Sequence, residues 1–398
     1  MDGSYDFIAQ DWQPQTALVR GGLERSPHQE TCEALYLTSG FVYDTAEEAE
    51  AAFKGDRKRY IYGRYGNPTV ATFEERLRLL EGADTCRATA TGMAALHAAL
   101  VCQLSAGDKL VASRALFGSC NYIISELLPR FGVETQFVDG TDYDQWEAAI
   151  GGDVTVTFFE SPSNPTLEII DIKRVAELTH AAGGKLVVDN ALASPVVQKP
   201  LALGADVVIY SATKHIDGQG RSLGGAILGE REIVEEKLSN ILRHTGPSLS
   251  PFNAWLMLKG LETLDLRVER QSKSAHQIAV FLMNHPRITK VHYPGLADHP
   301  DHALAKQQMR DGGTVVTFEF DGGKQTAFRF MNALELANIS NNLGDSKSLV
   351  THPATTTHQR IEDEERTRLG ITESMVRFSI GLEDVSDLIS DIERALTV

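Results

Sequence analysis

An aspartate and a lysine each follow an apolar run of this sequence, and together they could carry chemistry. Asp189 ends the run "KLVVD", and Lys214 follows "DVVIY" after the hydroxyl residues Ser211 and Thr213. The two residues lie 25 positions apart (214 − 189), enough for one crossover and return, so we expect them on neighbouring parallel strands. Because open α/β sheets bind ligands beyond the carboxyl ends of their strands, a carboxylate and an amine would face one crevice.

Two further segments extend this possible site. The segment "ATATGMAALHAAL" is typical of a polar turn that enters a helix, where unpaired N–H groups of Gly92 and Met93 favour a phosphate. Asn164 lies in the proline-framed loop "FFESPSNP". A phosphate at a helix N-terminus, a carboxylate on a pyridinium nitrogen and a lysine that bonds to an aldehyde suit pyridoxal phosphate (PLP). Taken singly, each feature also has an ordinary explanation as a turn cap, a solvated lysine or a glycine before a helix.

The elements that must position these residues alternate between short apolar runs and helix-like segments. "TVATFEERLRLLEG" predicts a helix that ends at Gly82, and "TGMAALHAALVCQL" predicts a second helix. The apolar runs lie at 109–113, 133–138, 154–160, 185–189 and 206–210. Continuous rather than alternating apolarity indicates strands that are covered on both faces. The sequence therefore predicts an α/β fold with a mainly parallel sheet.

The character of the chain changes near both ends. Residues 1–60 lack a strong period and carry mixed charge, which favours an arm that packs on something else over a compact core. After roughly residue 250 we expect one long helix, a few strands and an amphipathic closing helix. The predicted division is an arm at 1–60, a large α/β domain at 61–260 and a smaller α+β domain at 261–398.

Composition narrows the classes of partner. The chain has 398 residues, of which 42% are hydrophobic and 23% charged, as in ordinary globular proteins. Its net charge of −16 would repel a nucleic-acid backbone or an anionic membrane, so we expect neither as a partner. The first thirty residues show no signal-peptide pattern, and no stretch is apolar enough to span a bilayer, which favours a cytoplasmic location.

The cysteine and histidine spacings match no standard metal site. Four cysteines are scattered without close pairs, and we expect them to be reduced. His292, His299 and His302 lie close together in "HYPGLADHPDHALAK", but this spacing is not typical of zinc binding, so we predict no metal. His352 and His358 flank a threonine run and could line a pocket. A non-catalytic α/β scaffold and a metal hydrolase are the alternatives from other classes.

Six segments in order resemble one enzyme family much more specifically. They are "YGRYGNPT", "ATATGMAAL", "FFESPSNPTLEI", "VVDNALASP", "DVVIYSATKHIDGQGRSLGGAI" and "MVRFSIGLED". From about Tyr60 to the C-terminus the chain resembles the transsulfuration family of PLP-dependent enzymes, which includes cystathionine synthases, cystathionine lyases and methionine lyases. The resemblance implies PLP fold type I, the aspartate-aminotransferase-like arrangement, with a PLP-binding large domain.

The family resemblance implies roles within one subunit. Lys214 would form the Schiff base with PLP and shuttle protons, while Asp189 would pair with the pyridinium nitrogen. Gly92, Met93, Ser211 and Thr213 would hold the phosphate. Asn164 would bond the ring hydroxyl, and Arg377 of "MVRFSIGL" would grip the substrate's α-carboxylate through a bidentate guanidinium.

Other implied residues come from a neighbouring subunit. Tyr62 and Arg64 of "RYIYGRY" match family residues that reach the phosphate of the next subunit, and Tyr62 is also a candidate catalytic residue. The resemblance therefore implies a homo-oligomer that shares its active sites. At least a dimer is needed, and family members are usually tetramers built from dimers.

Two departures from the family pattern bear on the substrate. Phe117 stands where most members have a stacking tyrosine, and Asn342 stands where several have a serine. Phe117 can stack on PLP but has no hydroxyl to move a proton, which puts a lyase mechanism in doubt. The departures favour the sulfhydrylase branch, transferases that make the methionine precursor homocysteine from an O-acylhomoserine and sulfide. Arg114 is a candidate to bind a succinyl carboxylate or to form a structural ion pair.

Several related activities stay open on the sequence. Cysteine could replace sulfide as the nucleophile, as in a cystathionine γ-synthase. An acetyl ester could replace the succinyl ester. A methionine γ-lyase activity is the third alternative.

Overall fold

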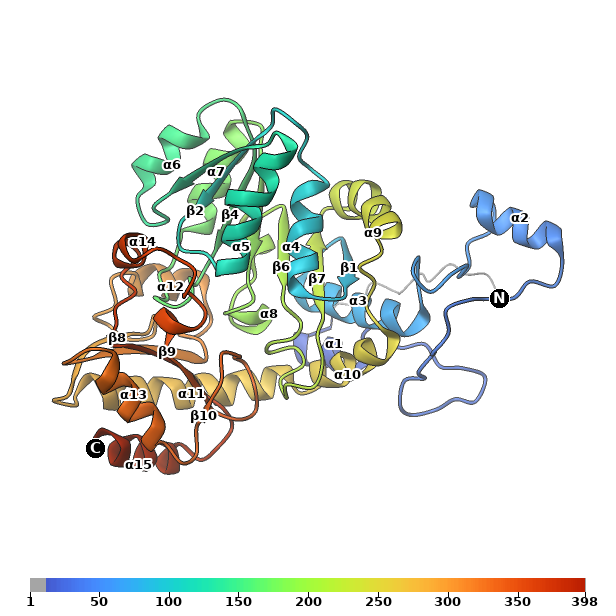
Figure 1. The fold of residues 1–398 in the computed structure, drawn as a ribbon. Helices are drawn as coiled ribbons and strands as arrows, with labels where there is room; N and C mark the ends of the chain where they lie inside the picture. Colours follow the sequence, from blue (N-terminus) through green and yellow to red (C-terminus); the bar gives the residue numbers. More distant parts are fainter. Residues whose placement is uncertain (1–11, 398) are drawn as a thin grey trace.

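Residues 12–397 are described by a computed structural model, whose main feature is a seven-stranded sheet (Figure 1). Its strand order is β1-β7-β6-β5-β4-β2-β3. Strands β2 to β6 pair in parallel, whereas β7 runs antiparallel to both β6 and β1. The strands span β1 Thr85–Thr89, β2 Lys109–Ser113, β3 Glu134–Val138, β4 Val154–Glu160, β5 Lys185–Asp189, β6 Val207–Tyr210 and β7 Gly225–Gly229. The predicted mainly parallel α/β sheet is confirmed.

Helices cover the sheet, and more helices lie in the C-terminal part (Figure 1). The α-helices are α1 Pro14–Arg20, α2 Ala46–Lys54, α3 Pro68–Glu81, α4 Gly92–Val101, α5 Gly118–Tyr122, α6 Tyr143–Ile150, α7 Ile172–Ala181, α8 Ser194–Val197, α9 Ser239–Thr245, α10 Pro251–Leu261, α11 Leu264–Met283, α12 His302–Gln308, α13 Lys324–Ala333, α14 Asp363–Arg368 and α15 Val385–Leu396. The π and 3-10 helices are η1 Ile123–Leu127, η2 Leu128–Phe131, η3 Pro200–Leu203, η4 Glu232–Leu238 and η5 Pro353–Thr355.

The helix that precedes β1 has clear local start and stop signals. The Asn67 side chain accepts hydrogen bonds from the Thr69 and Val70 N–H groups at the start of α3. Gly82 ends the helix with a φ of 82°, a left-handed conformation that favours glycine. This confirms the helix and the stop at Gly82 that the sequence predicts.

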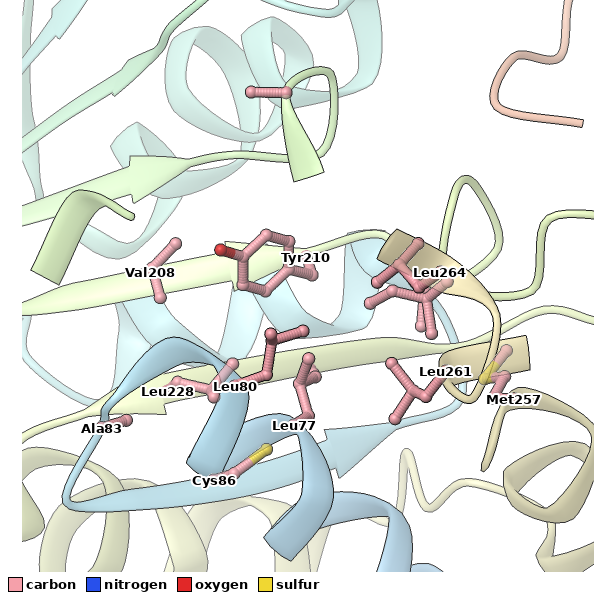
Figure 2. Close-up of a cluster of buried hydrophobic side chains, with 14 of the residues drawn as sticks. Leu77, Leu80, Ala83, Cys86, Val208, Tyr210, Leu228, Met257, Leu261 and Leu264 are labelled. Carbon is pink, nitrogen blue, oxygen red and sulfur yellow. The ribbon is translucent and has the colours of Figure 1, made fainter. Parts of the chain in front are cut away.

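One hydrophobic cluster joins the sheet to the helices that follow it in the chain. Figure 2 shows α3 side chains packing towards β6 and β7 and towards the helices α10 and α11. The labelled members are Leu77, Leu80, Ala83, Cys86, Val208, Tyr210, Leu228, Met257, Leu261 and Leu264. Leu77 and Leu80 are almost fully buried, so replacing either by alanine would destabilise the protein by about 2–5 kcal/mol. The cluster fixes β6, whose end leads into Lys214.

The C-terminal part contains a second, five-stranded sheet of order β10-β11-β12-β9-β8. Its strands are β8 Ile288–His292, β9 Val315–Phe320, β10 Asn338–Ile339, β11 Leu349–Thr351 and β12 Met375–Ser379. The long helix α11 runs along the base of the molecule from the large sheet to this smaller one, and α15 lies near it (Figure 1). The expected long helix, strands and closing helix are confirmed. The predicted boundary between residues 260 and 261 falls at the C-terminal end of α10.

The N-terminal segment is only partly an arm. Helix α1 packs on α3, and Leu18 is buried in the cluster of Figure 2. Beyond it the chain leads to α2, which projects far from the rest of the molecule on the right of Figure 1. Helix α1 therefore forms no core of its own but packs on another part of the same chain, where Leu18 joins the apolar face of α3; contact of the arm with a neighbouring subunit stays a prediction. Residues 1–11 lie outside the described residues.

Within residues 12–397, no helix combines the length and apolarity that a membrane crossing requires.

Candidate active site

The carboxyl edge of the large sheet encloses a cavity of about 250 Å³. Strands β4, β5 and β6 are consecutive parallel neighbours, so their C-terminal ends lie along this edge. Predicted site residues that line the cavity are Gly92, Met93, Phe117, Asn164, Asp189, Ser211, Thr213, Lys214 and Arg377. Residues more than 280 positions apart in the chain therefore meet at one place, since Arg377 comes from β12 of the smaller sheet (377 − 92 = 285).

Lys214 lies in the loop after β6 and is partly buried. Its Nζ donates a hydrogen bond of 2.6 Å to Oδ1 of Asn342. Burial, and then the nearby charge of Arg377, lowers the pKa of Lys214 to about 8, although Asp189 opposes this shift. The side chain is therefore much closer to a neutral, nucleophilic amine at physiological pH than an exposed lysine is.

Asp189 ends β5 beside the lysine loop. Its Oδ1 accepts a 2.9 Å hydrogen bond from the Ala191 N–H. Burial raises the pKa of this carboxyl, whereas the Ala191 bond and the Lys214 charge hold it down. A cationic group brought against Asp189 would stabilise its ionised form further.

The N-terminus of α4 borders the same cavity. The Thr91 side chain caps the helix by accepting from the Ala94 N–H at 3.0 Å, and the N–H groups of Gly92 and Met93 have no acceptor within the helix. A Cβ on Gly92 would lie 2.8 Å from Cβ of Ser211, so only glycine permits this close approach. The hydroxyl of Thr213 exchanges hydrogen bonds with the backbone of Gly224. This arrangement is a ready-made anion site.

Arg377 brings a positive charge to the cavity from β12 of the smaller sheet. Its Nη1 donates to Oδ1 of Asn164 at 2.9 Å, and its Nη2 donates to the Asn341 carbonyl at 2.9 Å. Burial lowers the pKa of Arg377 to about 10, so the guanidinium stays charged at neutral pH. Nε is buried and has no hydrogen-bond partner in the part of the chain that the structure describes. A buried, unsatisfied donor beside a cavity is suited to an anionic ligand group.

Four predicted residues do not line this cavity. Asn342 does not line the cavity itself, but its side chain accepts a hydrogen bond from Lys214, which does. Arg114 donates to the Phe137 carbonyl and pairs with Glu365 of α14 at 3.6 Å. Tyr62 and Arg64 lie elsewhere.

Tyr62 and Arg64 belong to the exposed segment that leads from the arm into α3. Tyr62 is 41% exposed, and the guanidinium of Arg64 stacks on its ring, 5.2 Å from the centroid. Arg64 also donates to the backbone carbonyl of Arg243. Arg64, but not Tyr62, lines a separate, open hollow formed by the arm, α3 and α9. A single chain therefore does not bring them to Lys214.

The histidines that the sequence analysis named form hydrogen bonds with neighbouring segments of the chain. His358 bonds the Asn164 carbonyl at 3.0 Å, and burial lowers its pKa to about 4, so it is neutral. His352 contacts the Thr355 hydroxyl and the Glu373 carbonyl. Neither lines the cavity. His292 pairs with Glu319, and His302 bonds the Pro294 carbonyl.

Sequence reasoning missed several residues of the cavity, of which Glu160 and Cys120 carry the most chemistry. Glu160 ends β4, in the same "FFESPSNP" segment that yields Asn164, so its position at a strand end was an available signal. His215 was also missed. It is buried next to Lys214 and bonds the Thr314 hydroxyl at 2.7 Å, and burial lowers its pKa to about 4.

Comparisons with known proteins agree with this geometry. A family model described as Cys/Met metabolism PLP-dependent enzyme matches residues 15–397. The chain is 56% identical over 386 residues to the O-succinylhomoserine sulfhydrylase of Mycobacterium tuberculosis, covering 96% of this chain and 95% of that protein. It is 47% identical over 381 residues to the protein of the same name from Pseudomonas aeruginosa, covering 96% and 94%.

A solved structure adds information on the cofactor. It is a Campylobacter jejuni protein described provisionally as an O-acetylhomoserine (thiol)-lyase, with a TM-score of 0.93 and 32% identity over 97% of this chain and all of the other. That structure contains N'-pyridoxyl-lysine-5'-monophosphate, a lysine joined to the cofactor.

The fold and the cavity define a PLP-dependent enzyme of fold type I. The chain belongs to the Cys/Met metabolism family of PLP-dependent enzymes. Its own residues fit the cofactor, because the α4 N-terminus suits a phosphate, Asp189 suits a ring cation and Lys214 suits an aldehyde. Helix α4 lies so close to Ser211 that no side chain fits at Gly92, which leaves the backbone of this helix N-terminus uncovered.

Proposed function

We propose that this enzyme converts O-succinyl-L-homoserine and sulfide into L-homocysteine and succinate, a γ-replacement that supplies methionine biosynthesis. The observation that carries the proposal is one cavity that combines Lys214, whose pKa is lowered to about 8, with Asp189 and the buried charge of Arg377. The two sulfhydrylase relatives at 56% and 47% identity support the choice of substrates. Phe117 supports it too, because its ring can stack but cannot relay a proton.

The residues around the cavity would hold PLP at three points. The backbone of Gly92 and Met93, with the hydroxyls of Ser211 and Thr213, would bind the phosphate; Asp189 would face the ring nitrogen, and Asn164 the ring hydroxyl. When bound, PLP supplies an electron sink that stabilises negative charge on the amino-acid substrate.

Lys214 would move the protons of the reaction. Its amine would take the proton from Cα of the substrate, then one from Cβ, and would return protons after sulfide has replaced succinate at Cγ. A pKa of about 8, lowered by burial, lets the amine both accept and donate a proton near neutral pH. Asn342, 2.6 Å from Nζ, would hold the amine in place between transfers.

Arg377 would orient the substrate. Its guanidinium is fixed by Asn164 and Asn341 and has one buried N–H free of protein partners within residues 12–397, so it would bind the α-carboxylate. Phe117 would stack on the cofactor ring and exclude water from that face.

The complete site would need a second chain. Tyr62 and Arg64 are presented on an exposed segment, where they would reach the phosphate of a neighbouring subunit, with Tyr62 also a candidate catalytic group. The proposed assembly is a tetramer built from dimers that share their active sites. The proposed location is the cytoplasm.

The test is homocysteine formation by the purified, PLP-loaded enzyme with sulfide, with O-succinyl- and O-acetyl-L-homoserine compared side by side. A higher kcat/KM with the succinyl ester is the expected result. A higher kcat/KM with the acetyl ester would mean that O-acetyl-L-homoserine is the substrate, while the type of reaction would be unchanged. Parallel assays replace sulfide by cysteine or omit it. Cystathionine or 2-oxobutyrate as the main product, without homocysteine, would contradict the proposal and indicate a γ-synthase or a γ-lyase.

A further inference from the structure

Glu160 is a buried carboxyl that the proposed reaction does not use. It ends β4 directly opposite Asp189 on β5 and is only 6% exposed. Both residues line the cavity, together with Cys120 of α5. The Cys120 sulfur and one carboxylate oxygen from each acid all lie within 4.8 Å of one another.

Glu160 also holds the loop that carries the stacking residue. Its Oε1 accepts a 2.7 Å hydrogen bond from the backbone N–H of Phe117. Phe117 is the N-cap of the short helix α5, and no side chain caps that helix. The carboxyl of Glu160 therefore holds the backbone at the start of α5 and ties the end of β4 to the residue whose ring would stack on the cofactor.

The two acids differ in how their charges are compensated. Asp189 has the Lys214 charge nearby and a backbone N–H at 2.9 Å. Glu160 receives the Phe117 N–H and contacts the Cys120 thiol, and burial followed by the charge of Asp189 raises its pKa well above the usual range. Two adjacent carboxylates in a water-poor site cannot both ionise easily, so the one without a cation keeps the proton.

The groups that face Glu160 come from several elements. Cys120 faces it from α5 and Asp189 from β5. Lys214, in the loop after β6, and Arg377, on β12, line the same cavity, and the charges of Asp189 and Arg377 both act on Lys214. Burial raises the pKa of the Cys120 thiol, so this thiol is neutral and adds no charge.

We propose that Glu160 is a positioning residue: its neutral carboxyl anchors the Phe117 backbone and leaves Asp189 as the single negative charge beside the cofactor ring. Asp189 can then form an ion pair with the ring nitrogen without repulsion from Glu160, because the neutral Glu160 carries no charge. The inference depends on the role proposed for Asp189 but not on the choice of substrate.

The test uses three variants of the full chain. Glu160→Gln keeps an acceptor for the Phe117 N–H and is always neutral. Glu160→Ala removes that acceptor. Glu81→Gln is the matched control, because burial raises the pKa of Glu81 to about 8 but Glu81 bonds Tyr210 and does not line the cavity. The dissociation constant of PLP and the visible absorption of the bound cofactor are measured without substrate from about pH 6 to about pH 9.

In wild-type protein we expect PLP affinity to gain a favourable contribution towards high pH as Glu160 ionises, because a second negative charge then lies beside the cationic ring nitrogen. Glu160→Gln should bind PLP within about threefold of wild type near pH 6 and should lack the contribution that Glu160 makes at high pH, which Glu81→Gln retains. Glu160→Ala should bind PLP roughly tenfold more weakly and show a shifted absorption band, because Phe117 is no longer held.

Unfolding of the cofactor-free protein by urea gives an independent readout. A carboxyl whose folded-state pKa is raised stabilises the fold below its unfolded pKa, and this contribution is lost as pH rises towards the folded pKa. Wild-type stability should therefore fall with rising pH more steeply than that of Glu160→Gln. The control Glu81→Gln should also reduce this slope without changing the cofactor spectrum.

Two results would overturn the inference. If Glu160→Gln weakens PLP binding more than tenfold near pH 6 or shifts the absorption band there, Glu160 is ionised in the working protein. If Glu160→Ala folds and behaves like Glu160→Gln, the anchoring of Phe117 is wrong. Failure of homocysteine formation would not affect these substrate-free measurements, so the two proposals can fail separately.

Discussion

Two regions of the molecule contribute to the proposed site, and they differ in what holds them. The carboxyl edge of the large sheet is buried, and its residues bond to partners within the same chain, as Lys214 does with Asn342. The segment with Tyr62 and Arg64 is exposed and stacks mainly on its own aromatic side chains. The difference teaches that a single chain by itself brings Lys214, Asp189 and Arg377 together, whereas the proposed role of the second region depends on a partner subunit.

The largest effect is expected at the sheet edge. Lys214→Ala should lower kcat of homocysteine formation by roughly 10³-fold or more, because it removes the group that moves protons at Cα and Cβ. The assay is sulfide-dependent homocysteine formation, and borohydride treatment followed by mass spectrometry shows whether PLP is fixed to the chain.

The control is Lys199→Ala, since Lys199 lies outside the cavity around Asp189. It should keep near wild-type activity and covalent PLP. Retention of borohydride-fixed PLP by Lys214→Ala would place the reactive lysine elsewhere and break the contrast between the two regions.

The next effect tests whether the exposed region serves another subunit. Arg64→Ala should weaken PLP binding about 10- to 100-fold, because a charge-assisted hydrogen bond to the phosphate is lost. Arg57→Ala is the matched control, since Arg57 is 55% exposed on the same arm and pairs only with Glu48 among the described residues. PLP titration measures both variants.

Mixing the two defective chains sharpens this test. Lys214→Ala and Arg64→Ala subunits, unfolded and refolded together, would form some sites with an intact Lys214 from one chain and an intact Arg64 from the other. Recovery of up to about a quarter of wild-type activity is expected for shared sites in random dimers. Recovery of none, with mixed dimers demonstrated, would show that Arg64 serves its own chain.

A smaller effect follows from the lowered pKa of Lys214. Capture of PLP by the cofactor-free enzyme should accelerate roughly tenfold between pH 7 and pH 9 and then level off, because the neutral amine dominates above its pKa of about 8. Stopped-flow absorbance measures the rate, with Nα-acetyl-lysine as the reference amine. A rate that keeps rising through about pH 10 would mean that the lysine is not perturbed by burial.

The smallest effect concerns the acyl group. Arg114→Ala should reduce kcat/KM for the succinyl ester by a few-fold more than for the acetyl ester, because only succinate adds a second carboxylate. Arg114 pairs with Glu365 at 3.6 Å, with both side chains partly exposed, so Glu365→Gln should free the guanidinium and favour the succinyl ester slightly. Equal losses with both esters in Arg114→Ala would assign Arg114 a purely structural role.

The regular elements were largely predictable, with clear exceptions. The runs that became β2, β4, β5 and β6 are largely apolar because they are buried inside the sheet, whereas the edge strand β3, "ETQFV", is polar and partly exposed. β1 and β7 were missed, since "TCRAT" is mixed in polarity and "GAILG" begins and ends with glycine. Their pairing with each other and with β6, rather than their own propensity, makes them strands.

The chemical core of the site followed from chain order, and its surroundings did not. Asp189 and Lys214 were predictable because consecutive parallel strands end at one edge. Cys120 gave no signal in the sequence, and the strand-end position of Glu160 could mark it as a site residue but not reveal its role, which depends on the charges that face it. Arg114 also gave no sign that Glu365, far along the chain, would pair with it.

The sequence by itself determined the family through six motifs in order, and it determined the large α/β sheet and the pair of ionisable groups at its edge because runs of apolar residues are local features of the chain. Only the tertiary structure decided which charges share a water-poor space: Arg377 beside Lys214, Glu160 beside Asp189, and Arg64 apart from both. The physical reason is that pKa values and binding geometry depend on burial and on neighbours distant in sequence, and these exist only once the chain has folded.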